Sequence, residues 1–87
     1  MIEISFKPSF VRQAKNLEKA LWQELVEKIE LLKDAKNHEN LKVHKLHGTL
    51  SECYSFSVNY KIRVVFEYAT KNEIVLLAVG DHDVYKN

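Results

Sequence analysis

A chain of 87 residues is the size of one small domain, so we expect a single domain over residues 1–87 with one layer of helix on one sheet. The hydrophobic fraction of 46%, the charged fraction of 29% and the net charge of +1 exclude a disordered or fibrous chain. One cysteine, Cys53, excludes an internal disulfide and a cysteine-rich zinc site, and it predicts a cytoplasmic protein. The longest apolar stretch, residues 74–79, is far shorter than the roughly 20 residues of a membrane span, so we expect no membrane partner.

The N-terminal half predicts a strand followed by two helices. Residues 1–5 alternate as a short strand does, and Pro8 ends the strand while Ser9 is placed to cap the next helix. Apolar residues then recur at three- and four-residue spacing, which is typical of an amphipathic helix. One helix over residues 10–35 would be about 39 Å long, too long for this domain, so we expect a break at residues 16–19 and a helical hairpin.

After a polar loop at residues 36–40 the apolar period changes to two. Residues 53–58 and 61–68 predict two strands with a tight connection between them. Residues 74–79 are apolar on both faces, so we expect a central strand that is covered on both sides. The predicted fold class is α+β, with an N-terminal strand, a helical hairpin and a three-stranded antiparallel meander, and with the helices packed on one face of the sheet.

Positive charge is concentrated in the middle of the chain. Residues 41–65 contain four lysines and arginines against one acid, a local net charge of +3, whereas acids and lysines alternate along residues 18–34 as on a solvated helix face. If the apolar positions of the meander face the helices, the opposite face carries Ser55, Ser57, Lys61 and Arg63. An arginine in mid-strand is compatible with a surface salt bridge and with a functional site, and the spacing leaves both open.

The histidines and the last residues leave further alternatives. His38, in the polar loop, is expected to be solvated. His44, His47 and His82 have no recognised zinc-ligand spacing and no cysteine beside them, so we expect no metal site. Gly80 ends the last apolar run and His82 follows it, which fits either a polar cap on the strand or the edge of a site.

The second half of the chain resembles a known family. The segment KLHGTLSECYSFSVNYKIRVVFEY, residues 45–68, followed by VGDHDVY, residues 79–85, is similar to the C-terminal half of bacterial toxins of the RelE/ParE superfamily. The resemblance is to the RelE- and YafQ-like messenger-RNA interferases of type II toxin–antitoxin systems in particular. Three motifs carry it: leucine-x-glycine at residues 46–48, tyrosine-x-x-arginine at residues 60–63 and glycine-x-histidine at residues 80–82. The predicted order of elements is similar to that of the family's fold.

The resemblance implies an endoribonuclease that cleaves messenger RNA, in most members on the ribosome, and so inhibits translation. In such a reaction a ribose 2′-hydroxyl attacks the adjacent phosphate, which needs a proton acceptor, a proton donor and cations, and needs no metal or other cofactor. The implied partners are messenger RNA, the ribosome and a cognate antitoxin. We expect a largely disordered antitoxin segment to fold across the helical hairpin and the sheet.

Four residues receive catalytic roles from the resemblance. His82 matches the family's late histidine and is the first candidate for acid or base, because the ordinary pKa of histidine suits both. Arg63 matches the strand arginine that would hold the phosphate. His44 resembles a histidine of YafQ-like members, and Tyr85 resembles a terminal aromatic that stacks on a base or donates a proton. The residues expected to contact RNA are Lys45, His47, Lys61 and Ser57.

Ser57 departs from the family pattern. It stands where the family often has an arginine, so one cation is missing and an attenuated toxin is one alternative. ParE members share the fold, act on DNA gyrase and lack this catalytic set. A protein-binding gyrase poison without nuclease activity is therefore the second hypothesis.

Overall fold

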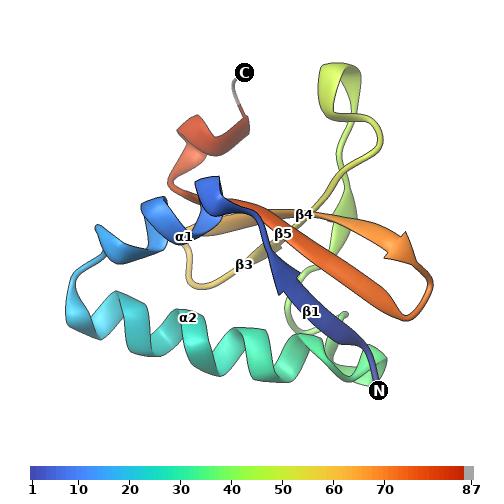
Figure 1. Ribbon diagram of the computed structural model, residues 1–87, viewed down its shortest axis with the longest axis horizontal. Coiled ribbons are helices and arrows are strands. Elements are labelled where there is room, and N and C mark those ends of the chain that lie inside the picture. The colour runs from blue at the N-terminus through green and yellow to red at the C-terminus, as the bar shows by residue number, and fades with distance from the viewer. Residues whose placement is uncertain (86–87) are drawn as a thin grey trace.

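The computed structural model describes residues 1–85, without the side chains of Thr49 and His82. Helix α2 lies under a twisted sheet, α1 lies beside the sheet, and two short 3₁₀ helices rise on the side opposite α2 (Figure 1). None of the helices in the described part of the chain has the length and hydrophobicity of a membrane span. The elements are β1 (Glu3–Phe6), α1 (Pro8–Lys15), α2 (Lys19–Leu32), η1 (Ala35–Asn37), β2 (His44–Lys45), η2 (Gly48–Leu50), β3 (Tyr54–Ser57), β4 (Arg63–Thr70), β5 (Glu73–Gly80) and η3 (His82–Tyr85).

The five strands form one mixed sheet in the order β1-β5-β4-β3-β2. Strands β3, β4 and β5 form the predicted antiparallel meander, and β1 pairs parallel with β5. Strand β5 is therefore internal, as predicted. Strand β2, which pairs antiparallel with β3, was not predicted, because two residues are too few to show a period.

The core lies between the sheet and the helices and follows the predicted alternation. Phe56, Val64 and Phe66 of the meander are fully buried, together with Leu25 and Leu32 of α2. Burying each such side chain contributes about 1.5–3 kcal/mol. The predicted break between the helices is confirmed, since α1 ends at Lys15 and α2 begins at Lys19.

Helix α1 is attached to the edge of β5 by side chains. Ser9 does not cap the helix: Lys7 is the N-cap residue, without a side-chain hydrogen bond, and Ser9 Oγ donates to the Leu77 carbonyl at 2.8 Å. The Val79 amide donates to Gln13 Oε1 at 2.9 Å. Strand β1 pairs with β5 only as far as Leu76, so α1 side chains satisfy backbone groups that β1 leaves unpaired.

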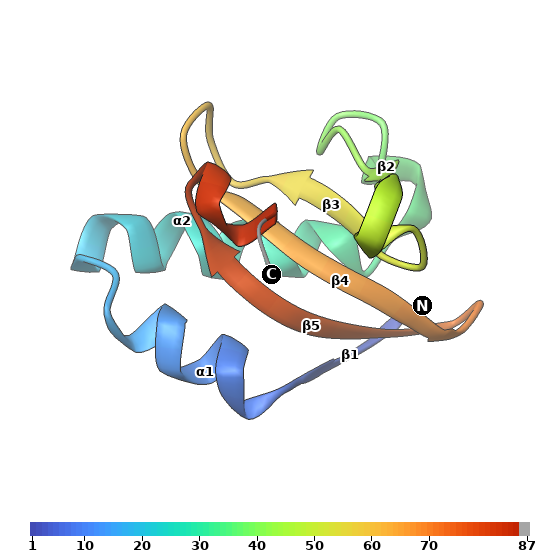
Figure 2. The ribbon, with the colours of Figure 1, turned by 90° about the horizontal axis from the view of Figure 1, so that it is seen from above.

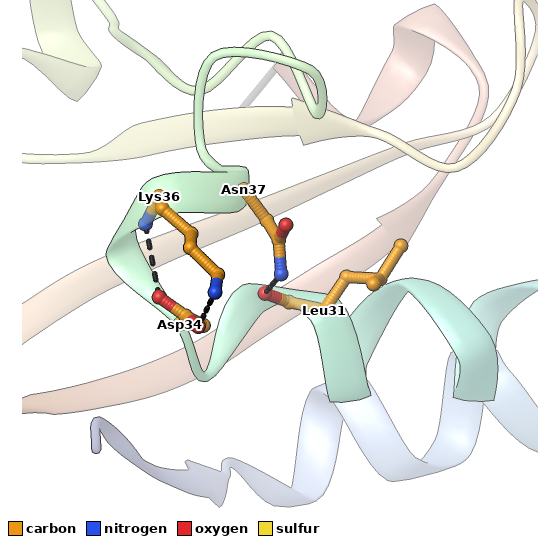
Figure 3. Close-up of polar contacts among 4 residues, drawn as sticks. All are labelled: Leu31, Asp34, Lys36 and Asn37. Atoms are coloured by element: carbon orange, nitrogen blue, oxygen red, sulfur yellow. Dashed lines mark hydrogen bonds and ion pairs between the residues drawn. The ribbon is translucent and has the colours of Figure 1, made fainter.

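The C-terminus of α2 is closed by the polar segment that follows it (Figure 3). Asn37 Nδ2 donates to the Leu31 carbonyl at 2.9 Å, so a free carbonyl of the last helical turn has a partner. Asp34 Oδ1 accepts from the Lys36 amide at 3.1 Å, and Lys36 Nζ lies 3.6 Å from Asp34 Oδ2. The predicted polar loop therefore begins as the 3₁₀ helix η1.

The prediction that β5 is covered on both sides is wrong. Its residues facing the helices, such as Ile74 and Leu76, are fully buried, whereas Val75, Leu77 and Ala78 are only half-buried. Helix η3 contacts β4 and β5, and it leaves these three residues partly exposed to solvent. The sheet thus has one face packed on helices and one face that is partly open.

Candidate active site

The face of the sheet opposite α2, here called the open face, lies between η2 and η3. Figure 2 looks onto this face, with η3 in red near the end of β5 and η2 in yellow-green above the other half of the sheet. The strand register places His44 beside Ser55, and Ser57 beside Arg63. Paired residues of antiparallel strands point to the same side. Three of the predicted site residues therefore share the open face, with Ser55 between them.

Arg63 is half-buried and is held by the turn that precedes its strand. Its Nη1 donates to the Asn59 carbonyl at 2.5 Å and to the Ile62 carbonyl at 3.3 Å. Arg63 makes no ion pair with any side chain that the structure describes, so the surface salt bridge is not observed there, and its functional role stays a prediction. A guanidinium has five N–H donors, so Nε and Nη2 remain for an anion.

Asn59 organises the turn that positions Arg63. Its Oδ1 accepts from the amides of Lys61 and Ile62, both at 2.8 Å, and its Nδ2 donates to Glu24 of α2 at 3.4 Å. An asparagine that bonds the backbone two and three residues ahead is typical of a tight turn. The sequence predicted the turn here, and the anchoring of Arg63 by the Asn59 carbonyl was not predicted.

His44 is exposed, and a backbone contact fixes its neutral tautomer. His44 Nδ1 lies 2.8 Å from the Lys42 carbonyl, and a carbonyl can only accept, so Nδ1 carries the proton. Lys42 has a φ of 60°, uncommon for a residue other than glycine. In the neutral ring Nε2 is then the lone-pair nitrogen. His44 is thus arranged as a proton acceptor on the open face.

Tyr85 lies over the middle of the open face. Its hydroxyl is 2.8 Å from Ser55 Oγ, and Ser55 is fully buried. Gly80 leaves room for η3: a Cβ on Gly80 would lie 2.9 Å from Val84 Cγ1, so a larger residue would require Val84 to shift. The structure therefore brings Tyr85 to the same face as His44.

The other predicted residues are placed less centrally. The side chain of His82 lies outside the described atoms, so its role stays a prediction. Lys45 is paired with Tyr54, which places it on the helix side of the sheet. His47 and Lys61 are exposed, in the loop before η2 and in the turn after β3. Among the described side chains, no three His, Cys, Asp or Glu residues are grouped as metal ligands would be.

His38 has a structural role, and the prediction that it is merely solvated is wrong. It is half-buried, and its Nε2 donates to the Leu32 carbonyl at 2.8 Å. This bond satisfies another carbonyl at the end of α2. His38 therefore belongs to the closure of that helix and not to the open face.

Two groups near the sheet have shifted pKa values. Burial raises the pKa of the Cys53 thiol, and the carboxylates of Glu67 and Glu52 raise it further. Burial, and then Tyr54, raise the pKa of Tyr68. Cys53 is therefore kept as a neutral thiol, which is the opposite of what a nucleophilic cysteine needs.

No protein-family model and no curated protein sequence matches this chain. Solved structures do. The structure of YafQ from Escherichia coli aligns over 100% of both chains with a TM-score of 0.80 at 14% sequence identity. The chain has a RelE/YafQ-like fold.

Two further structures share the RelE/YafQ-like fold. A chain of the heterotetrameric YoeB–YefM toxin–antitoxin complex from Staphylococcus aureus has a TM-score of 0.73 and 22% identity, with 94% of this chain and 98% of that chain covered. A chain of the archaeal RelE–RelB complex from Pyrococcus horikoshii has a TM-score of 0.72 and 21% identity, covering 92% and 93%. The fold that the sequence resemblance implied is confirmed.

Proposed function

We propose that this chain is the toxin of a type II toxin–antitoxin system and a metal-independent endoribonuclease. It cleaves messenger RNA on the ribosome, in the cytoplasm, and so inhibits translation. The observation that carries the proposal is the arrangement of the open face of a RelE/YafQ-like sheet. His44 offers a proton acceptor at Nε2, and Arg63 offers N–H donors from the same face.

The spacing of these two residues suits a ribose–phosphate unit. Strands β2 and β4 lie on either side of β3, and the two residues are offset by two residues along the strands, so their backbones are roughly 12 Å apart. A histidine and an arginine side chain can both reach a group held between them. His44 Nε2 takes the proton of the 2′-hydroxyl, and the 2′-oxygen forms a bond to phosphorus.

The remaining steps need a cation and an acid. Arg63 stabilises the negative charge that gathers on the phosphate oxygens as the bond to the 5′-oxygen breaks. We assign the protonation of that oxygen to His82, with Tyr85 stacking on a neighbouring base or sharing the acid role. The products are a 2′,3′-cyclic phosphate and a 5′-hydroxyl, and no atom from a metal-bound water enters them.

Ser57 limits the rate in this proposal. It is paired with Arg63 on the open face, and it stands where related toxins often carry an arginine. A hydroxyl cannot supply the second positive charge. The chain is therefore a slower nuclease than a relative with two arginines at this place.

An antitoxin partner is supported by an apolar groove between the two helices. The groove has a volume of about 310 Å³, and two of its aromatic side chains, Phe6 and Trp22, are 50% and 44% exposed. Val26 on α2 continues this surface. An amphipathic antitoxin helix would bury these side chains, and acidic residues in another part of the antitoxin would approach Lys61 and Arg63. The solved toxin–antitoxin complexes with this fold support such a partner.

Expression in bacteria tests the proposal. Wild-type protein is expected to arrest growth and to create new 5′ ends in cellular messenger RNA, detected by primer extension. His44→Gln, which retains a donor for the Lys42 carbonyl but has no basic nitrogen, is expected to do neither while remaining folded. Growth arrest with intact messenger RNA and trapped gyrase–DNA complexes would replace this proposal by the gyrase-poison hypothesis.

A further inference from the structure

A second hollow lies on the open face, beyond the pair formed by Ser55 and Tyr85. Its volume is about 310 Å³, and it lies between α1, η2 and η3, with β4 and β5 as its floor. Its lining is mixed: Val65 and Ala78 in the floor and Val84 in η3 are apolar, and polar side chains of α1 and η3 complete the rim. Val65 and Ala78 belong to the same register row as Ser55, so the hollow is continuous with the candidate active site.

Gln13 supplies an oriented polar group at the rim of this hollow. The Val79 amide donates to Gln13 Oε1 at 2.9 Å, and because an amide N–H can only donate, the acceptor must be the oxygen of the side chain. The other terminal atom of the side chain is therefore the nitrogen Nε2, which carries two N–H donors. Nε2 has no hydrogen-bond partner among the residues that the structure describes.

The charge of the lining favours a neutral occupant. Within the described residues the hollow is lined by no lysine or arginine, and Asp83 adds a carboxylate to its rim. A phosphate would find no cation in this lining, whereas the face of a nucleobase fits the apolar side chains of the floor and its edge can accept from an amide. The guanidinium of Arg63 lies outside this lining on the open face, and the phosphate is expected beside it.

We propose that this hollow binds the base next to the cleaved bond and that Gln13 helps to select it. The inference rests on the proposed nuclease function. Nε2 donates to an acceptor on the base edge, such as a carbonyl oxygen or a ring nitrogen. Tyr85 follows Val84, which lines the hollow, and its hydroxyl bonds to Ser55 on the open face. Bases that present an acceptor at this position are cleaved preferentially.

Gln13→Glu is the sharp test, because it keeps the size and the acceptor oxygen of the side chain and changes its donors and its charge. A glutamate retains an oxygen for the Val79 amide but replaces the two Nε2 donors by an acceptor. Gln23→Glu on the exposed surface of α2 is the matched control, with the same change of charge. The measurement is the distribution of bases beside the cleavage sites in one set of transcripts, read by mapping 5′ ends.

We expect Gln13→Glu to change the relative use of the preferred base by roughly five- to tenfold, and Gln23→Glu to leave the distribution unchanged. Identical distributions for wild type and Gln13→Glu would overturn the inference.

A binding experiment separates this inference from the proposed function. Guanosine monophosphate, titrated into the wild-type protein, is expected to shift the amide NMR signals of Leu50, Cys53 and Val84, and ribose 5-phosphate is expected not to. If the wild type cleaves no RNA but guanosine monophosphate produces these shifts, the nuclease proposal fails and the base site stands. Equal shifts with both compounds would show a phosphate site, and no shifts would show no site; either result overturns the inference.

Discussion

Replacing Arg63 separates its contribution to folding from its contribution to the reaction. Its Nη1 donates to two carbonyls of the preceding turn, those of Asn59 and Ile62. In Arg63→Met both bonds are lost, each worth about 0.5–1.5 kcal/mol, so the free energy of unfolding should fall by about 1–3 kcal/mol. For a domain of this size each kcal/mol lowers the melting temperature by roughly 4–8 °C.

The effect on the reaction should be larger than the effect on folding. Removing one donor that stabilises transition-state charge typically lowers kcat by roughly 100- to 1,000-fold. Arg63→Lys retains the charge, but one ammonium group cannot bind the turn carbonyls and a phosphate oxygen at the same time. We therefore expect a smaller loss of stability than in Arg63→Met, and a kcat that is still at least tenfold lower than that of the wild type. Lys61→Met is the comparison: this exposed cation does not anchor the turn through its side chain, so KM should rise while kcat remains near wild type.

The assay pairs thermal unfolding with single-turnover cleavage of messenger RNA on programmed ribosomes. Below the melting temperature of each variant, the rates compare folded molecules only. Two results would refute the role assigned to the guanidinium. One is a kcat of Arg63→Lys equal to that of the wild type. The other is a loss of activity in Arg63→Met that disappears once the unfolded fraction is accounted for.

Three further predictions follow from the sheet and the helices. Ser57→Arg restores the cation beside Arg63 and should raise kcat by roughly tenfold, measured in the same cleavage assay; an unchanged kcat would show that the position does not limit the rate. Val26→Glu places a charge in the apolar groove and should weaken antitoxin binding at least tenfold by calorimetry, without the same loss in Gln23→Glu. Because the pKa of Cys53 is raised by burial and then by Glu67, alkylation of the folded protein should begin at higher pH than alkylation of the unfolded chain, and Glu67→Gln should move the onset to lower pH. A raised pKa also means that this thiol's contribution to stability is present below its unfolded pKa and is lost as the pH rises through its folded pKa. Coincident onsets for the folded and unfolded chains would contradict the burial of the thiol.

Local patterns were enough for much of the fold. Alternation along residues 53–58 and 61–68 gave the two faces of the meander, because the side-chain period of a strand is two wherever one face is buried. The helical hairpin followed from length alone, since one helix over residues 10–35 would extend beyond the domain. Arg63 could be assigned to the open face from the same alternation.

Contacts between distant residues could not be read from local patterns. Ser9 looked like a cap because serine commonly caps helices, but its partner, Leu77, is 68 residues away. Gln13 and Val79 are 66 residues apart, so nothing in the sequence near Gln13 indicated a site. His44 was assigned through the resemblance, whereas its tautomer depends on the backbone of Lys42, which sequence patterns do not report.

The chemistry of the cut ends tests the central claim most directly. Ribosomes carrying a defined messenger RNA would be incubated with purified wild-type protein or with His44→Gln, and the ends of the products would be identified. The proposed reaction predicts 5′-hydroxyl and 2′,3′-cyclic phosphate ends with wild type, and a rate at least 100-fold lower with His44→Gln. Products with 5′-phosphate ends would show a different, water-dependent reaction. Messenger RNA left intact by folded wild-type protein would contradict the nuclease function itself.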